Sequence, residues 1–127
     1  VPVSKVADFL DQATALVERL IPGVRTCAFG HIGDGNIHFN LTQPENADKT
    51  AFLDQWDATN RAVHDMVMAM NGSFSAEHGV GQLKTGEMAR LKDPVELDLM
   101  RTLKAALDPH GLMNPGKVLP DAKNPQE

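Results

Sequence analysis

The chain contains a single cysteine, few aromatic residues and no long apolar run. Cys27 alone excludes an internal disulfide and fits a reducing compartment, and its strand-like surroundings predict a small core residue. No apolar run approaches the roughly 20 residues that span a bilayer. Basic residues number 12 against 17 acidic ones and form no cluster with aromatics, which argues against nucleic acid as a partner. These absences leave a soluble, cytoplasmic globular protein as the expectation.

The length of 127 residues suits one domain with a real core, and the hydrophobic fraction of 42% is ordinary for a globular chain. The chain begins Val1-Pro2-Val3, without an initiator methionine or a signal-peptide pattern. We therefore expect a piece cut from a larger protein. Internal repeats and low-complexity segments are absent from the sequence.

Hydrophobic periodicity predicts an α+β fold, in which helices pack on a small antiparallel sheet. Ser4 is the expected cap of a first helix, whose apolar positions recur every three or four residues up to Leu20. The remaining expected elements are strands at 24–31 and 36–42, a helix at about 49–70, a short strand at 73–76, a short helix near 82–90 and a helix that begins after Asp93 and ends at Asp108.

One apolar stripe of the predicted helix at 49–70 defines the expected core. Trp56, with Phe52, Val63 and Val67, should pack against the sheet face that carries Ile37 and Phe39.

Two histidines flank a Gly-Asp-Gly-Asn turn in the segment from His31 to His38. If residues 33–36 form the loop, Ile32 pairs with Ile37 and His31 lies directly opposite His38. Opposed residues have Cβ atoms roughly 5 Å apart, so both rings could reach one ion at about 2.1 Å. Histidines beside a turn are also common as solvated polar residues, and that alternative stays open.

Glu77 and His78 lie far downstream and could complete this site. Glu77 would make a set of two histidines and one carboxylate, the ligand type of catalytic metals that keep a position open for substrate or water. His78 would point to the other side of an extended chain, where its imidazole could remove a proton. Asn40 shares a strand face with His38.

Three motifs in order carry a family resemblance: His31-x-Gly-Asp-Gly-Asn-x-His38 followed by Phe39-Asn40, then Glu77-His78-Gly79-Val80-Gly81, then Leu107-Asp108-Pro109 with Asn114-Pro115-Gly116-Lys117. From about residue 5 to 119 the chain resembles the C-terminal region of FAD-linked oxidases of the vanillyl-alcohol-oxidase type. The members it is most similar to are the D-2-hydroxyglutarate, D-lactate and glycolate dehydrogenases.

The resemblance implies a role for each matched residue. A divalent metal, usually zinc, would be bound by His31, His38 and Glu77. His78 would take the hydroxyl proton of a D-2-hydroxy acid while hydride passes to FAD, and Asn40 would contact the carboxylate or hydroxyl end of the substrate. Asn114 and Lys117 would belong to a tail that approaches the flavin.

The resemblance also implies how the protein is divided. Residues 1–127 would form about half of a larger substrate domain, ending in a flavin-contacting tail at about 111–119, without the N-terminal FAD-binding domain. The chain alone would then be inactive. Its expected partners are the 2-hydroxy acid, its own or a separate FAD-binding domain, an electron acceptor, and a second copy that joins through exposed strand edges.

Two other classes remain open from the residues. One is a stand-alone non-haem iron enzyme that uses His31, His38 and Glu77, although such sites usually lie in barrels of many strands. The other is a non-catalytic α+β binding or assembly module.

Overall fold

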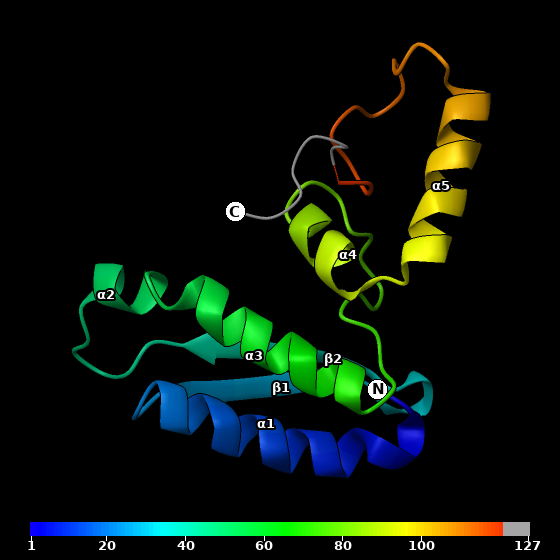
Figure 1. Cartoon of the computed structure of the whole chain (residues 1–127). Coiled ribbons are helices and arrows are strands. Elements are labelled where there is room, and N and C mark those ends of the chain that lie inside the picture. Colours follow the sequence, from blue (N-terminus) through cyan, green and yellow to red (C-terminus); the bar gives the residue numbers. More distant parts are fainter. Residues whose placement is uncertain (121–127) are drawn as a thin grey trace. The chain divides into compact units, whose positions relative to one another are not determined.

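Two antiparallel strands, β1 (Arg25–His31) and β2 (Asn36–Thr42), form the one sheet among the residues that the structure describes, 1–120. The structure is a computed structural model in which the chain divides into two units after Glu77 (Figure 1). Each unit is described by itself below. The α+β class and the antiparallel sheet predicted from the sequence are confirmed.

The register of the hairpin differs from the predicted one. Gly30 pairs with Ile37 and His31 pairs with Asn36, so the predicted pairing of Ile32 with Ile37 is wrong. The loop consists of a 3₁₀ turn, η2 (Ile32–Asp34), closed by Gly35. The N–H of Gly35 donates to the carbonyl of Ile32, and its φ of 70° is left-handed, a conformation that glycine adopts without steric cost. The loop therefore occupies residues 32–35, one residue closer to the N-terminus than the predicted loop at 33–36.

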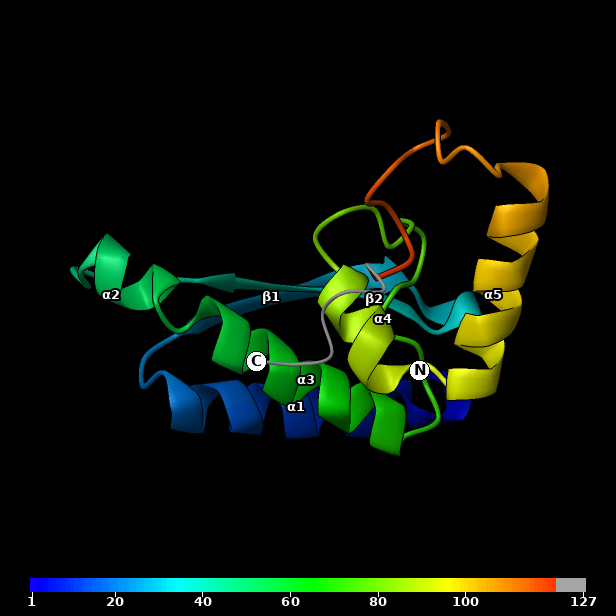
Figure 2. The same cartoon turned by 45° about the horizontal axis from the view of Figure 1, so that its top comes forward.

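The two faces of the hairpin have opposite character. Ile37 and Phe39 point to the inner face, where helices α1 (Val6–Leu20) and α3 (Trp56–Ala69) lie side by side beneath the strands in Figure 2. Cys27, Phe29, His31, His38 and Asn40 alternate with the inner residues and belong to the other face, called the outer face below.

The core lies between α1, α3 and the inner face. Its buried centre is formed by Phe9, Ala13 and Val67, with Val63, Met66 and Met70 packed around it. The predicted stripe of α1 is confirmed for Val6, Phe9, Ala13 and Val17, whereas Leu20 is exposed and Ile21 is buried in its place. The predicted cap is wrong, since Ser4 lies in a 3₁₀ turn, η1 (Val3–Lys5), and α1 has no side-chain cap.

The single helix predicted at 49–70 is wrong, because two helices occupy this range. Asp48 caps α2 (Lys49–Leu53) by accepting from the N–H of Ala51. Between α2 and α3, the N–H of Gln55 donates to the carbonyl of Phe52, three residues earlier, instead of the carbonyl four residues earlier that an α-helix would use. Trp56 then begins α3, two turns before Val63, and is 56% exposed. Its predicted place in the core is wrong, because the core contacts the later turns of α3.

Two further predictions about the first unit are wrong. Cys27 is exposed, because it lies on the outer face opposite Asn40. Residues 73–76 form no strand: the hydroxyl of Ser73 instead bonds locally, donating to the carbonyl of Ser75 and accepting from its N–H.

The second unit contains α4 (Thr85–Leu91), α5 (Pro94–Leu107) and the segment that follows them to residue 120. Asp93 caps α5 as predicted, accepting from the N–H groups of Val95 and Glu96 at 2.8 and 3.3 Å. Within residues 1–120, every helix is too short or too polar to cross a membrane.

Candidate active site

Glu77 joins the two histidines of the hairpin in one cluster on the outer face. Its Oε1 contacts Nδ1 of His31, and its Oε2 lies 3.2 Å from Nε2 of His38. Because His31 pairs with Asn36, the two histidines are diagonal neighbours on one face rather than directly opposed. Both can therefore reach the carboxylate of Glu77, which lies 39 residues after His38 in the sequence.

The cluster is half-buried and electrostatically coupled. The side chain of His38 is 28% exposed, that of Glu77 34% and that of His31 66%. Burial of the carboxyl acts to raise the pKa of Glu77, but hydrogen bonds and charge interactions with His38 and His31 together outweigh it, so the pKa lies below its usual value. Glu77 is thus held as a carboxylate between two imidazoles.

The donor types of the cluster suit a divalent ion, since imidazole nitrogens and a carboxylate are usual ligands of zinc. The donor atoms, however, face one another instead of a common point: one nitrogen of each imidazole, Nδ1 of His31 and Nε2 of His38, contacts an oxygen of Glu77. Among the 120 described residues, no group of three or more His, Cys, Asp or Glu is arranged to hold a metal ion. The geometry is therefore a hydrogen-bonded cluster, and the predicted zinc site is not supported by it.

Asn40 lies on the outer face, two residues after His38 and opposite Cys27. It is exposed, so its amide is open to contact from a substrate on the same face as the cluster.

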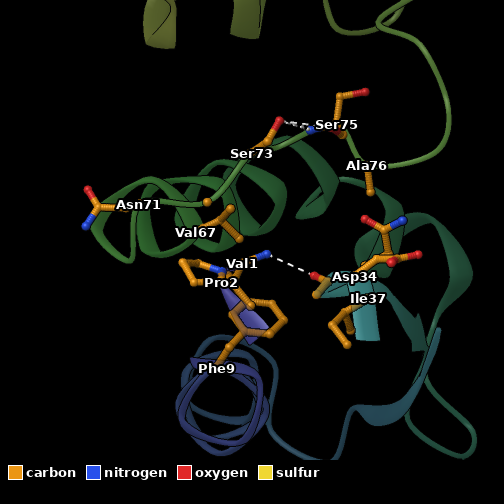
Figure 3. A pocket seen from close by; sticks show the side chains of 13 residues that line it. Val1, Pro2, Phe9, Asp34, Ile37, Val67, Asn71, Ser73, Ser75 and Ala76 are labelled. Atoms are coloured by element: carbon orange, nitrogen blue, oxygen red, sulfur yellow. Dashed lines mark hydrogen bonds between the residues drawn. The ribbon is translucent and has the colours of Figure 1, made fainter. Parts of the chain in front are cut away.

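A cavity of about 440 Å³ lies at the turn end of the hairpin, on the inner side (Figure 3). Phe9, Ile37 and Val67 line it from α1, β2 and α3, and Ser73 and Ser75 from the segment that leads to Glu77. The amino group of Val1 donates to the carbonyl of Gly35 at 3.0 Å beside this cavity. The side chains of the cluster do not line it.

The second unit brings two of the sequence motifs together. The N–H of Val118 donates to the carbonyl of Gly81 at 2.8 Å, which joins the segment after His78 to the tail that contains Asn114 and Lys117. His78, Asn114 and Lys117 are all exposed.

Asp108 anchors the start of this tail. It is buried and accepts from the N–H groups of Leu112 and Met113, both at 2.9 Å, and from the ammonium group of Lys104. The bond from Lys104, followed by that from Met113, holds the pKa of Asp108 below its usual value. This role was not predicted, although an aspartate that directly follows a helix often accepts hydrogen bonds from nearby backbone N–H groups.

Phe29 is a second residue that the sequence did not single out. Its ring stacks on the imidazole of His38, with centroids 4.9 Å apart and planes 15° apart. The correct register would have identified it, because a loop at residues 32–35 makes Phe29 the direct cross-strand partner of His38.

The hairpin, the helices on its inner face and the histidine–glutamate cluster on its outer face define a small α+β domain with a candidate polar site. Residues 1–118 match the family described as FAD linked oxidases, C-terminal domain. The chain belongs to this family. Membership argues against the stand-alone iron enzyme, as does the sheet of only two strands found within residues 1–120.

Three relatives show the range of similar proteins. D-2-hydroxyglutarate dehydrogenase of Stutzerimonas stutzeri is 42% identical over 118 residues, covering 93% of this chain and 25% of the relative. The mitochondrial D-2-hydroxyglutarate dehydrogenase of Bos taurus is 39% identical over 120 residues, 94% of this chain and 21% of the relative. A D-2-hydroxyglutarate–pyruvate transhydrogenase of Saccharomyces cerevisiae is 32% identical over 114 residues, 90% of this chain and 22% of the relative. The chain thus spans about a quarter of the length of these relatives.

Proposed function

We propose that this chain is the C-terminal part of a flavin-dependent dehydrogenase that oxidises a D-2-hydroxy acid to a 2-oxo acid and passes the hydride to FAD. The observation that carries the proposal is the meeting of His31, His38 and Glu77 on one sheet face, in a chain of the FAD-linked oxidase family. The names of the relatives make D-2-hydroxyglutarate the first substrate to test, ahead of D-lactate and glycolate.

In this proposal the chain supplies part of the substrate domain, over residues 1–127, of which 121–127 lie outside the described residues. The tail at about 111–119, with Asn114 and Lys117, contacts the flavin. FAD is bound mainly by a separate domain, so the 127-residue chain alone is inactive.

Each polar residue then has a part in substrate oxidation. Asn40 binds the carboxylate or hydroxyl end of the substrate from the outer face. His78 accepts the proton of the 2-hydroxyl, for which a neutral imidazole is suited near pH 7. Exposure of both side chains supports this division, since neither is committed to the core.

A divalent metal, zinc by family resemblance, forms the second part of the proposal, with His31, His38 and Glu77 as its ligands. Its support is the type of the donor atoms, two imidazole nitrogens and a carboxylate. To bind the ion, the three side chains would exchange their contacts with one another for bonds to the metal. When bound, such an ion polarises the 2-hydroxyl and lowers its pKa.

His78→Ala in the complete enzyme tests the catalytic part. We expect flavin reduction by D-2-hydroxyglutarate to fall by roughly 10² to 10⁴ while FAD stays bound, because the proton acceptor is lost. KM should change far less than kcat. His110→Ala, which removes an exposed histidine outside the motifs, is the matched control. Flavin reduction by His78→Ala at the wild-type rate would place the base elsewhere.

Zinc binding to the 127-residue chain tests the metal part by calorimetry. We expect one site, weakened by His31→Ala and His38→Ala and unaffected by His110→Ala. Absence of binding to the wild-type chain would contradict the metal while leaving the role of His78 open to its own test.

The remaining parts of the proposal concern self-association, the electron acceptor and the cellular compartment. Each strand has one edge without a ladder partner among residues 1–120, which favours association with a second copy. Light scattering on the purified chain would show a dimer or larger species. The enzyme would act in the cytoplasm and pass electrons from reduced FAD to a separate acceptor.

A further inference from the structure

Phe29 is a large apolar residue of β1 that lies outside the core. Its side chain is 55% exposed on the outer face, whereas the core is built on the inner face around Phe9, Ala13 and Val67. Phe29 does not belong to that core cluster. The contact that it does make is with a residue of the candidate site.

This contact is a ring stack on His38. Phe29 and His38 are direct partners in the register of β1 and β2, and their rings are nearly parallel, 15° apart, with centroids separated by 4.9 Å. Aromatic rings favour offset stacking at centroid distances of about 4.5 to 7 Å. The phenyl ring therefore covers one face of the imidazole, while Glu77 contacts its Nε2 edge.

The two histidines of the cluster are held differently as a result. His38 is restrained by both a ring face and a carboxylate, and its side chain is 28% exposed. His31 contacts the same carboxylate but is 66% exposed, and its cross-strand partner is Asn36 rather than an aromatic residue. The stack with Phe29 is thus one contact that distinguishes His38 from His31.

We infer that Phe29 is a positioning residue for His38: its ring fixes the plane of the imidazole so that Nε2 is aimed at the position of Glu77. The inference about geometry stands on the stack itself, and its consequence for catalysis rests on the proposed function.

Nuclear magnetic resonance on the 127-residue chain tests the geometry without any assay of activity. In the wild-type chain we expect cross-relaxation between the Phe29 and His38 ring protons, and an upfield ring-current shift of the His38 signals. Phe29→Leu should move these signals downfield, Phe29→Tyr should restore them, and Cys27→Ala, on the same strand and face, should leave them unchanged. Absence of the cross-relaxation in the wild-type chain would overturn the inference, even if Phe29→Leu did not fold.

Kinetics of the complete enzyme test the consequence. Phe29→Leu should lower kcat/KM about tenfold, because a histidine free to rotate leaves its productive geometry, and Phe29→Tyr should retain most of the rate. A wild-type rate in Phe29→Leu, where His78→Ala is inactive, would refute the positioning role and leave the proposed function standing. An active His78→Ala enzyme with the stack intact by resonance would instead refute the role of His78 alone. Failure of the complete wild-type enzyme to reduce its flavin with any of the three hydroxy acids, with the stack intact, would refute the proposed function alone.

Discussion

Gly30 precedes His31 in β1, and Gly33 lies within the turn that follows His31. The structure predicts opposite responses to the same substitution at these two positions. A Cβ atom added at Gly30 would lie 2.1 Å from the backbone oxygen of Asn36 on the facing strand and 3.2 Å from Cα of Ile37. A Cβ atom added at Gly33 would meet no atom within 4 Å. Gly30→Ala should therefore disturb the hairpin, and Gly33→Ala should not.

The cost of Gly30→Ala follows from the contact with Asn36. Contacts of Cβ below 3.0 Å are essentially never observed, so the strands must separate locally by about 1 Å. Ladder hydrogen bonds stretched by that amount no longer count as bonds. Two such losses at about 0.5 to 1.5 kcal/mol each, with backbone strain of about 1 to 3 kcal/mol at a φ of 155°, amount to roughly 2 to 6 kcal/mol.

Urea unfolding of the 127-residue chain, followed by circular dichroism, measures this difference. Gly33→Ala should stay within about 0.5 kcal/mol of wild type. The resonance signals of His31 and His38 should shift in Gly30→Ala and remain in place in Gly33→Ala. Equal stability of the two variants would refute the register and the turn described above.

Two further predictions concern the core and the tail. Phe9→Ala should cost about 3 to 5 kcal/mol in the same assay, because Phe9 is 3% exposed and its ring packs edge-on against Phe39 at 5.7 Å; Trp56→Ala should cost less than about 1 kcal/mol, and equal losses would contradict the location of the core. The lowered pKa of Asp108, caused first by Lys104, means that this carboxylate stabilises the fold above the usual pKa of aspartate and ceases to do so as the pH falls through its folded value. The free energy of unfolding of wild type should therefore exceed that of Asp108→Asn most clearly near pH 7, and the difference should shrink as the pH falls below the usual pKa of aspartate. Urea unfolding measures it, and a difference independent of pH would contradict the role of Asp108.

Features that depend on neighbours in sequence were predictable. The periodicity of α1, the capping of α5 by Asp93 and the two strands of the hairpin all follow from residues a few positions apart. Local spacing sets which side chains share a helix face, and a cap bonds N–H groups within three residues of itself. The opposite character of Ile37 and His38 follows in the same way from the alternation of a strand.

The candidate site was only partly predictable. The sequence and the family resemblance named His31, His38 and Glu77 together, and the structure does bring them into contact. The predicted pairing of His31 with His38 was wrong by two residues, since His31 pairs with Asn36. The cause is a loop at 32–35 instead of the predicted 33–36, a shift of one residue. Such a shift changes every cross-strand partner, which is why the stack of Phe29 on His38 was missed.

The sequence by itself determined the two strands of the hairpin, the apolar face of α1 and the start of α5 after Asp93. Only the tertiary structure decided that Trp56 is exposed, that Cys27 lies on the outer face and that one carboxylate bonds both histidines. The physical reason is that each of these features depends on how two segments distant in sequence pack against each other. An apolar stripe specifies that a helix face will be covered, but the length of the facing element decides which turns of that helix it covers.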